Sequence, residues 1–374
     1  MKIFVLGTRG FPNVQGGVEK HCEELYPRLV SLGFDITVTT RTPYIRKDQR
    51  LKSWKGVRFK HIWCPHVKSL EAIIHTFLVL LSAVIDRPRI IHFHTIGPAL
   101  LIPFARLLGF RVVMTHHGAD YKRQKWGPTA KRVLALGEYV GVKYANATIV
   151  ISQAIKTNLE ERFPRSSLYL IGNGINTPAR VESGSTLVRF GLHPRAYVFT
   201  ACRLVPEKGL HDLVTAYSGI HNPSFQLVIA GEADHETSYS RSLKSDAKAA
   251  GVILTGNIFG IELAELYSNA ALFVLPSYHE GFPIALLEAL SYSLPVLVSD
   301  IPPHKGFPLS EQRYFVPGDI TGLREQMKRL IDEGTSATES DTYERILVDK
   351  YNWDVIAKET ASVYWELSGQ VVSA

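Results

Sequence analysis

The chain has 374 residues, and its 42 Lys+Arg against 35 Asp+Glu give a formal net charge of +7. At roughly 150 residues per domain, this length predicts two or three domains. The 45% hydrophobic content excludes a disordered chain. Cys22, Cys64 and Cys202 are scattered, which excludes a disulfide framework and indicates a reducing compartment. The positive charge favours anionic partners such as phosphates or a membrane surface.

No segment has the signature of a membrane span or a signal peptide. The N-terminal run Met1–Gly7 is too short for a signal peptide and has no small-residue cleavage site. The longest apolar stretch, Ala72–Ile85, is interrupted by His75 and Ser82 and falls short of the roughly 20 residues of a spanning helix. We expect it to be a helix packed on a sheet, with a helix resting at a membrane interface as the alternative.

In chain order, the first half alternates short β-branched runs with helical patterns. The pattern over Val18–Leu32 predicts a helix. Short β-branched runs predict strands at 2–6, 35–40, 90–94, 111–115 and 147–152. This alternation is typical of a parallel, doubly wound α/β sheet. The run Ile149–Ile151 is apolar throughout, as expected for a strand covered on both faces.

A polar stretch over 177–185 predicts a linker, after which the alternation restarts. Strands are expected at 197–202, 225–230, 252–255, 272–276 and 295–299, with helices at 210–217, 261–268 and, at the end, 353–367. We therefore predict an α/β fold with two Rossmann-like domains facing across a cleft. The expected boundaries are 1–176, 177–350 and a terminal segment, 351–374, that packs on one domain or across both.

A glycine-rich loop follows the first strand. The dinucleotide fingerprint G-x-G-x-x-G is absent, which argues against a simple dehydrogenase. Instead, Gly16 and Gly17 stand just before a helix, where glycines allow close backbone approach and free amide groups attract phosphate. A plain turn with permissive glycines is the alternative.

Two cations follow the first strand of the second half. Arg203 and Lys208 lie at its carboxyl end, where open α/β sheets bind ligands. An arginine fork and a lysine point charge together suit a diphosphate. The alternative is an ordinary solvated loop.

Two glutamates follow a later strand at E-x7-E spacing. Glu280 lies in the loop after Pro276, and Pro283 suits the first turn of the next helix. Glu288 lies inside that helix among leucines, so its carboxylate needs a partner. A ribose diol is one such partner and a structural salt bridge is the other.

Taken together in order, the Gly16-Gly17-Val18-Glu19 loop, the Arg203…Lys208 pair and the Glu280…Glu288 element resemble glycosyltransferase family 4 over nearly the whole chain. The supporting segments are Thr115–Asp120, Ile171–Asn176 and Ile229–Glu232. The segments Gly7–Gly10 and Lys122–Trp126 are similar to a subgroup of bacterial surface-polysaccharide transferases that includes rhamnosyltransferase-like members.

The resemblance implies a retaining transferase of the GT-B fold. It would move a hexose or deoxyhexose from a nucleoside-diphosphate sugar to a glycan or lipid-linked acceptor in O-antigen, capsule or exopolysaccharide biosynthesis. No acidic pair of the DxD type is convincingly placed, so no metal and no cofactor are expected, and the nucleotide sugar is a substrate. The expected location is cytoplasmic, with the inner face of the cell membrane as a peripheral site.

The same resemblance assigns roles to the donor side. Arg203 and Lys208 would hold the diphosphate and stabilise the charge that grows on it as it leaves. Glu288 would take the ribose hydroxyls, and Glu280 would contact the donor sugar. The backbone amides after Glu280 would contact sugar or phosphate, and the turn after the third strand of this half would line the nucleobase. The residues concerned are Gly281, Phe282, Ile284 and Ala285 in the first case, and Gly256 and Ile258 in the second.

Family members often carry glycine where this chain has Pro283, which has no amide hydrogen to donate. On the other half of the chain, His117 matches the histidine near the transferred sugar, with a satisfied structural histidine as the alternative; His116 is expected to be structural. Gly16 and Gly17 would let their loop close on the diphosphate.

A basic segment with one tryptophan is expected on the acceptor side. Lys122, Arg123, Lys125 and Trp126 fit a lipid-linked pyrophosphate or an anionic bilayer, or they form a solvated charge run. Nucleic acid is disfavoured, because no nucleic-acid-binding motif accompanies them. Two other functions remain open at this point: a nucleotide-sugar 2-epimerase-like isomerase, and a non-catalytic sugar-nucleotide-binding subunit.

Overall fold

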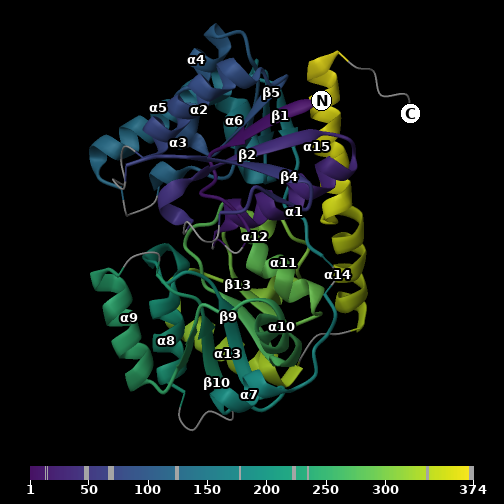
Figure 1. Ribbon diagram of the computed structural model, residues 1–374. Coiled ribbons are helices and arrows are strands. Elements are labelled where there is room, and N and C mark those ends of the chain that lie inside the picture. The colour runs from purple at the N-terminus through teal and green to yellow at the C-terminus, as the bar shows by residue number, and fades with distance from the viewer. Residues whose placement is uncertain are drawn as a thin grey trace. The chain divides into compact units, whose positions relative to one another are not determined.

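The computed structural model describes residues 1–12, 14, 16–45, 50–65, 71–122, 126–176, 178–220, 225–233, 236–333 and 337–369. The chain forms two compact units: unit 1 is Met1–Gly174 with Lys350–Ala374, and unit 2 is Ile175–Asp349. The predicted α/β class is confirmed, because each unit has a mainly parallel sheet covered by helices (Figure 1). The chain passes from unit 1 to unit 2 after Gly174, where the sequence placed the boundary after residue 176.

Within the described residues, unit 1 has an eight-stranded sheet in the order β3-β4-β2-β1-β5-β6-β7-β8, parallel except for the β3–β4 pair. Its strands are β1 Lys2–Leu6, β2 Asp35–Arg41, β3 Ser53–Trp54, β4 Val57–Ile62, β5 Ile90–His94, β6 Arg111–His116, β7 Ala147–Val150 and β8 Leu168–Leu170. Its α-helices are α1 Gly17–Ser31, α2 Glu71–Asp86, α3 Ile96–Ala99, α4 Ile102–Leu107, α5 Pro128–Tyr144, α6 Gln153–Arg162 and α15 Trp353–Ser368.

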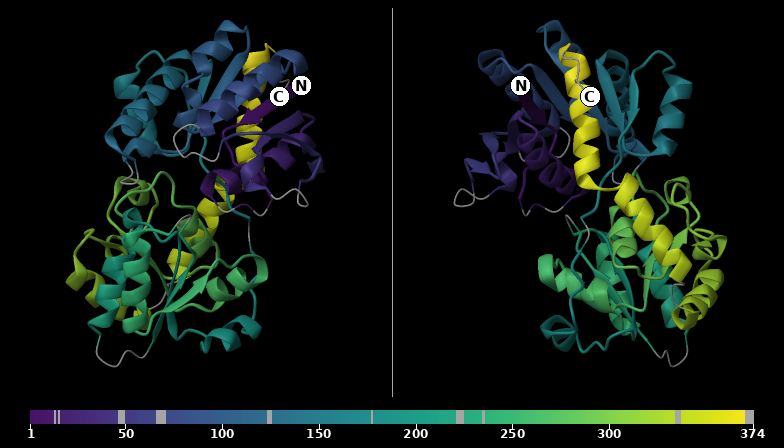
Figure 2. Two further views of the ribbon diagram at one scale, coloured as in Figure 1. Left: turned by 60° about the vertical axis from the view of Figure 1, so that its left-hand side comes forward. Right: turned by 90° about the vertical axis from the view of Figure 1, so that its right-hand side faces the viewer.

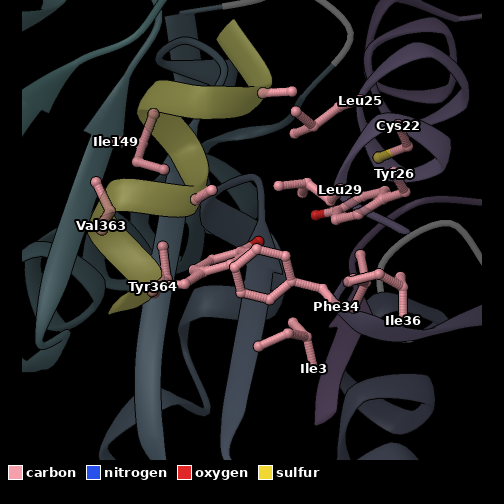
Figure 3. Packing of buried hydrophobic residues seen from close by; sticks show 14 of the residues in the cluster. Ile3, Cys22, Leu25, Tyr26, Leu29, Phe34, Ile36, Ile149, Val363 and Tyr364 are labelled. Atoms are coloured by element: carbon pink, nitrogen blue, oxygen red, sulfur yellow. The ribbon is translucent and has the colours of Figure 1, made fainter. Parts of the chain in front are cut away.

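Alternation along β1 explains how both faces of this sheet are buried. Ile3 and Val5 pack with α1 and α15, while Phe4 and Leu6 pack with α2, α3 and α4 on the other face. The ring of Tyr364 on α15 contacts that of Phe34, with centroids 5.5 Å apart (Figure 3). The terminal helix therefore completes the core of unit 1, in which the N-terminal strand also lies (Figure 2).

Within its described residues, unit 2 has a six-stranded sheet in the order β11-β10-β9-β12-β13-β14, with parallel pairings. Its strands are β9 Tyr197–Ala201, β10 Gln226–Ala230, β11 Ile253–Gly256, β12 Leu272–Leu275, β13 Val296–Ser299 and β14 Tyr314–Phe315. Its α-helices are α7 Ser185–Phe190, α8 Leu210–Ser218, α9 Ser238–Ala249, α10 Gly260–Asn269, α11 Ile284–Ser291, α12 Pro302–Lys305, α13 Ile320–Glu333 and α14 Ala337–Lys350.

Each sheet reverses its strand order at one place. In unit 1 the chain goes from β1 outward to β2 and later returns to β5 on the other side of β1; in unit 2, β10 and β12 flank β9 in the same way. Such a reversal of strand order is where open α/β sheets generally bind ligands, at the carboxyl ends of the strands. None of the described helices is long and apolar enough to cross a bilayer.

Candidate functional site

The switch point of unit 2 brings the predicted cations beside the predicted acid. Arg203 and Lys208 follow β9, and Glu280 follows its neighbour β12. Lys208 Nζ lies 2.5 Å from Glu280 Oε1, and the Ser277 hydroxyl donates to the same oxygen at 2.7 Å. Two donors therefore hold one carboxylate oxygen of Glu280 in place.

Glu280 is buried but remains charged. Burial alone would raise its pKa, yet Lys208, His304 and the hydrogen bonds from Lys208 and Ser277 together outweigh burial, so the pKa lies below its usual range. The side chain of Lys208 is 17% exposed, against 7% for Glu280. The lysine is thus more exposed than the carboxylate with which it pairs.

Gly209 permits this close approach of the two loops. It adopts φ +64°, and a Cβ at this position would stand 2.0 Å from the carbonyl oxygen of Pro276. On the other side of the same contact, the amide of Tyr278 donates to the carbonyl of Glu207 at 2.9 Å. A side chain at position 209 would push Lys208 away from Glu280.

The other predicted donor-side residues lie in neighbouring loops of unit 2. Arg203 comes directly after Cys202, whose thiol pKa is raised by burial and lowered by the charges of Lys208 and Arg203. The predicted nucleobase turn begins at the end of β11, where the carbonyl of Gly256 accepts from Gly231 at 2.9 Å. The loops after β10 and β11 are therefore joined, and Ile258 in this turn is buried.

Helix α11 begins one residue later than the predicted first-turn proline, since Pro283 is its N-cap. The amide of Ile284 donates to the carbonyl of Phe282 at 3.1 Å, so this candidate phosphate donor is already engaged. Glu288, half-buried inside α11, accepts a hydrogen bond from the Tyr267 hydroxyl at 3.0 Å. This hydrogen bond holds one carboxylate oxygen, and the ribose role of Glu288 stays a prediction.

In unit 1, the glycine loop is tied to helix α1 by an ion pair. The guanidinium of Arg9 lies 3.2 Å from Glu19, which also accepts from the Arg9 amide at 3.1 Å. Gly16 caps α1 at φ +151°, and a Cβ there would stand 2.0 Å from a carboxylate oxygen of Glu19. Gly16 therefore has a structural reason to be glycine besides the predicted diphosphate contact, which stays untested.

His117 lies at the end of a buried chain of hydrogen bonds that the sequence analysis missed. His94 Nδ1 is 2.8 Å from His117 Nε2, and His94 Nε2 is 2.5 Å from the Tyr26 hydroxyl. Beside this, His92 Nδ1 is 2.5 Å from the Tyr364 hydroxyl, and His92 Nε2 is 2.7 Å from Thr115 Oγ1. The chain thus links α1, β5, β6 and α15 in one network.

These imidazoles are neutral. Burial, followed by the neighbouring histidines, lowers the pKa of His94 and of His117 well below the usual range. Burial likewise lowers the pKa of His92 to about 3 and raises that of Tyr26, so its hydroxyl keeps its proton. Each histidine therefore has one donor and one acceptor nitrogen.

Two directions of donation along Tyr26, His94 and His117 satisfy both hydrogen bonds. We assign the direction in which the Tyr26 hydroxyl donates to His94 Nε2. The proton of His94 is then on Nδ1, from which it is donated to His117 Nε2. The proton of His117 is accordingly on Nδ1, which makes this atom a hydrogen-bond donor beyond the network.

His116 is not part of this hydrogen-bond network and instead stabilises the turn after β6. Its Nε2 lies 2.9 Å from Glu138, its Nδ1 accepts from the Gly118 amide at 3.2 Å, and both side chains are buried. The predicted basic segment is only partly covered: Arg123 and Lys125 lie outside the described residues, Lys122 ends a short 3₁₀ turn, and Trp126 is half-buried.

His21 adds a third imidazole beside His94 and His117. Its Nδ1 is 2.6 Å from Asn173 Oδ1, burial lowers its pKa to about 4, and its Nε2 is buried without a hydrogen-bond partner. Nitrogens of the three histidines lie within 4.8 Å of one another, which a metal ion could span. Such an ion would have to displace the proton shared by His94 and His117. The sequence signal for this cluster was present in the strand Ile90–His94, where two histidines alternate in an apolar run.

Comparisons with known proteins agree with this two-unit arrangement. The family model described as Glycosyltransferase Family 4 matches residues 15–178, and that described as Glycosyl transferases group 1 matches residues 191–346. The glycogen synthase of Mycobacterium tuberculosis is 25% identical over 397 residues, covering 97% of this chain and 94% of the relative.

Two solved structures are similar over the full chain. Sucrose-phosphate synthase from Thermosynechococcus elongatus aligns with a TM-score of 0.83 at 19% identity, covering 98% of this chain and 99% of its own. Anabaena HepE in complex with UDP-glucose aligns with a TM-score of 0.77 at 16% identity, covering 97% and 99%. At these identities the likeness establishes the fold.

Proposed function

The chain belongs to glycosyltransferase family 4, with the GT-B fold and a nucleoside-diphosphate sugar as donor, and from that premise we propose that it is a retaining transferase that moves a hexose or deoxyhexose to a glycan or lipid-linked acceptor. Both family models describe glycosyl transferases, so the isomerase and the non-catalytic subunit are set aside. The proposed pathway is surface-polysaccharide biosynthesis, supported by the resemblance of Gly7–Gly10 and Lys122–Trp126 to transferases of that kind.

The observation that carries this proposal is the position of Lys208 and Arg203 at the switch point of unit 2. As the bond to the anomeric carbon breaks, negative charge grows on the departing diphosphate. Cations held in place beforehand stabilise that charge without reorganising, and they do so without a metal. HepE binds UDP-glucose in a structure of the same fold, which supports a nucleotide sugar as the anion that these cations meet.

In unit 1, His117 is proposed to donate from Nδ1 to a hydroxyl of the transferred sugar. A neutral donor of this kind orients a substrate and does not remove a proton from it, so the acceptor proton passes to the leaving phosphate oxygen. Tyr26 and His94 are positioning residues, because they determine which nitrogen of His117 carries the proton.

A thermal-shift screen with UDP, GDP, dTDP and ADP tests the donor assignment. The cognate nucleotide should raise the melting temperature, because a ligand that binds only the folded chain stabilises it by mass action. Transfer is then assayed with the matching sugars and a lipid-linked saccharide, in the presence of EDTA. Release of nucleoside diphosphate only with acceptor, and a product that keeps the anomeric configuration of the donor, are the expected results. Flat responses to every nucleotide, or an epimerised donor, would contradict the proposal.

A further inference from the structure

Helix α2 has an exposed side that is apolar. It carries no charged side chain between Glu71 and Asp86. Val79, Leu80 and Ala83 pack on the sheet, whereas Phe77, Leu81 and Ile85 are exposed. A helix with one side in water normally places charged residues there. The exposed side of α2 is therefore suited to a less polar surrounding than water.

Helices α4 and α5 extend this surface. The ring of Phe77 stacks on that of Phe104 in α4, with centroids 6.0 Å apart, and α4 packs in turn on α5. All three helices lie on the same side of the sheet of unit 1 (Figure 1). Leu107, which is 85% exposed, and Leu136 and Tyr139 on α5 add further apolar groups. We call the exposed side chains of these three helices the α2–α5 face.

The charges of this face have one sign. The carboxylates on α2, α4 and α5 belong to Glu71, Asp86 and Glu138, and they pair with Arg41, Lys60 and Arg162 respectively, at 2.5–2.6 Å. The exposed charged side chains on the same helices are those of Arg106, Arg132 and Lys143. Lys143 lies over the ring of Tyr139, 5.2 Å from its centroid. Apolar groups and cations therefore share the face without an exposed carboxylate from these helices.

We propose that the α2–α5 face docks on an anionic lipid bilayer. The exposed aliphatic side chains enter the boundary between headgroups and acyl chains, and Arg106, Arg132 and Lys143 meet lipid phosphates. A second copy of the chain fits less well, because a symmetric contact would place these cations against themselves. Docking itself does not depend on the proposed function. Only its purpose rests on that function, because docking would hold the enzyme near a lipid-linked acceptor.

Co-sedimentation of the full chain with vesicles tests the docking without requiring catalysis. The vesicles are phosphatidylcholine alone and phosphatidylcholine with phosphatidylglycerol, each at low and high salt. The test variant is Ile85→Asn with Leu107→Asn, at side chains 84% and 85% exposed. Its matched control is Val188→Asn with Ile261→Asn in unit 2, at side chains 79% and 71% exposed.

The wild-type chain and the control should bind the anionic vesicles only, and less at high salt. The test variant should bind them about tenfold more weakly, because two aliphatic groups no longer leave water. Equal binding by variant and wild type, or no binding by the wild type, would overturn the proposal. So would light scattering that shows a wild-type dimer which the test variant separates. Transfer to a soluble acceptor is measured in parallel, so that a failure of docking and a failure of the proposed function are told apart.

Discussion

The places where the two sheets reverse their strand order hold different kinds of chemical group, although the sheets have the same architecture. In unit 2 the edge of the sheet holds full charges, with Lys208 against Glu280 and Arg203 nearby. In unit 1 the corresponding edge holds neutral rings, with Tyr26, His94 and His117 joined by hydrogen bonds. A cation pair suits a phosphate, whereas neutral donors and acceptors suit the hydroxyl groups of a sugar. The two edges therefore differ in the kind of chemical group that each can bind.

The contrast also predicts how each unit responds to acid. In the unfolded chain these histidines titrate near pH 6.5, whereas burial lowers the folded pKa to about 4 for His21 and His75 and to about 3 for His92. Between those values only the unfolded chain binds the proton, so stability is full above pH 6.5 and falls as the pH drops. Over that pH range, each such histidine lowers the free energy of unfolding by about 1.4 kcal/mol for each pH unit. The free energy of unfolding of unit 1 should therefore fall by several kcal/mol.

Unit 2 is the internal control for this largest effect. In unit 2, burial lowers the pKa of His304, and the pKa of Glu280 lies below its usual range, so the stability that Glu280 contributes is lost only at still lower pH. Hydrogen exchange measured peptide by peptide between pH 6.5 and pH 4.5 should show unit 1 losing protection first. Equal loss in both units would show that the imidazole network is not what separates them.

The ionic side of the comparison is tested by Lys208→Ala. Loss of the cation should lower kcat about 10²- to 10³-fold, as expected for removing a preorganised group that stabilises transition-state charge. The variant also leaves Glu280 buried without its cation, so its melting temperature is measured as well. Lys208→Arg should restore part of the rate. Lys244→Ala, which removes the surface pair with Glu232 at 2.7 Å, is the control and should change neither quantity.

The neutral side is tested by Tyr26→Phe. Without the hydroxyl, His94 Nε2 loses its donor and the proton of His117 is no longer held on Nδ1. We expect kcat to fall about tenfold, by analogy with groups that orient a ligating histidine, while KM for the donor stays nearly constant. The ¹⁵N shifts of the His117 ring should change from one tautomer to a mixture. Tyr169→Phe, whose hydroxyl bonds to Glu366 at 2.9 Å, should leave rate and shifts as they are. Unchanged shifts in Tyr26→Phe would contradict the assigned tautomer.

The smallest expected effect concerns Glu288. Tyr267→Phe removes the hydroxyl that donates to its carboxylate, and one neutral hydrogen bond is worth about 1 kcal/mol. KM for the nucleotide sugar should rise about fivefold if Glu288 binds the ribose. Tyr292→Phe is the matched control, since its ring stacks on Tyr267 with centroids 5.3 Å apart. A normal KM in both variants would leave Glu288 with a structural role.

Much of the fold follows from local patterns. The strands Lys2–Leu6 and Ile90–His94 have the bounds expected from their β-branched runs, and α15 ends within one residue of its predicted end. Short edge strands such as β3 and β14, with two residues each, were missed because so few residues carry no periodic signal. The helix over Ala72–Ile85 was predicted, either packed on a sheet or resting at a membrane interface. The structure shows that one side of it packs on the sheet and the other side is exposed, which periodicity alone did not decide.

By itself, the sequence determined the α/β class, the two doubly wound halves and the candidate cations and acids, because hydrophobic period and motif spacing are properties of neighbours along the chain. Only the tertiary structure decided that Lys208 pairs with Glu280, and that Tyr26 and Tyr364 join the histidines of β5. Those contacts join residues 68 to 272 positions apart. They depend on strand order and on the return of α15 to unit 1, which no local pattern encodes.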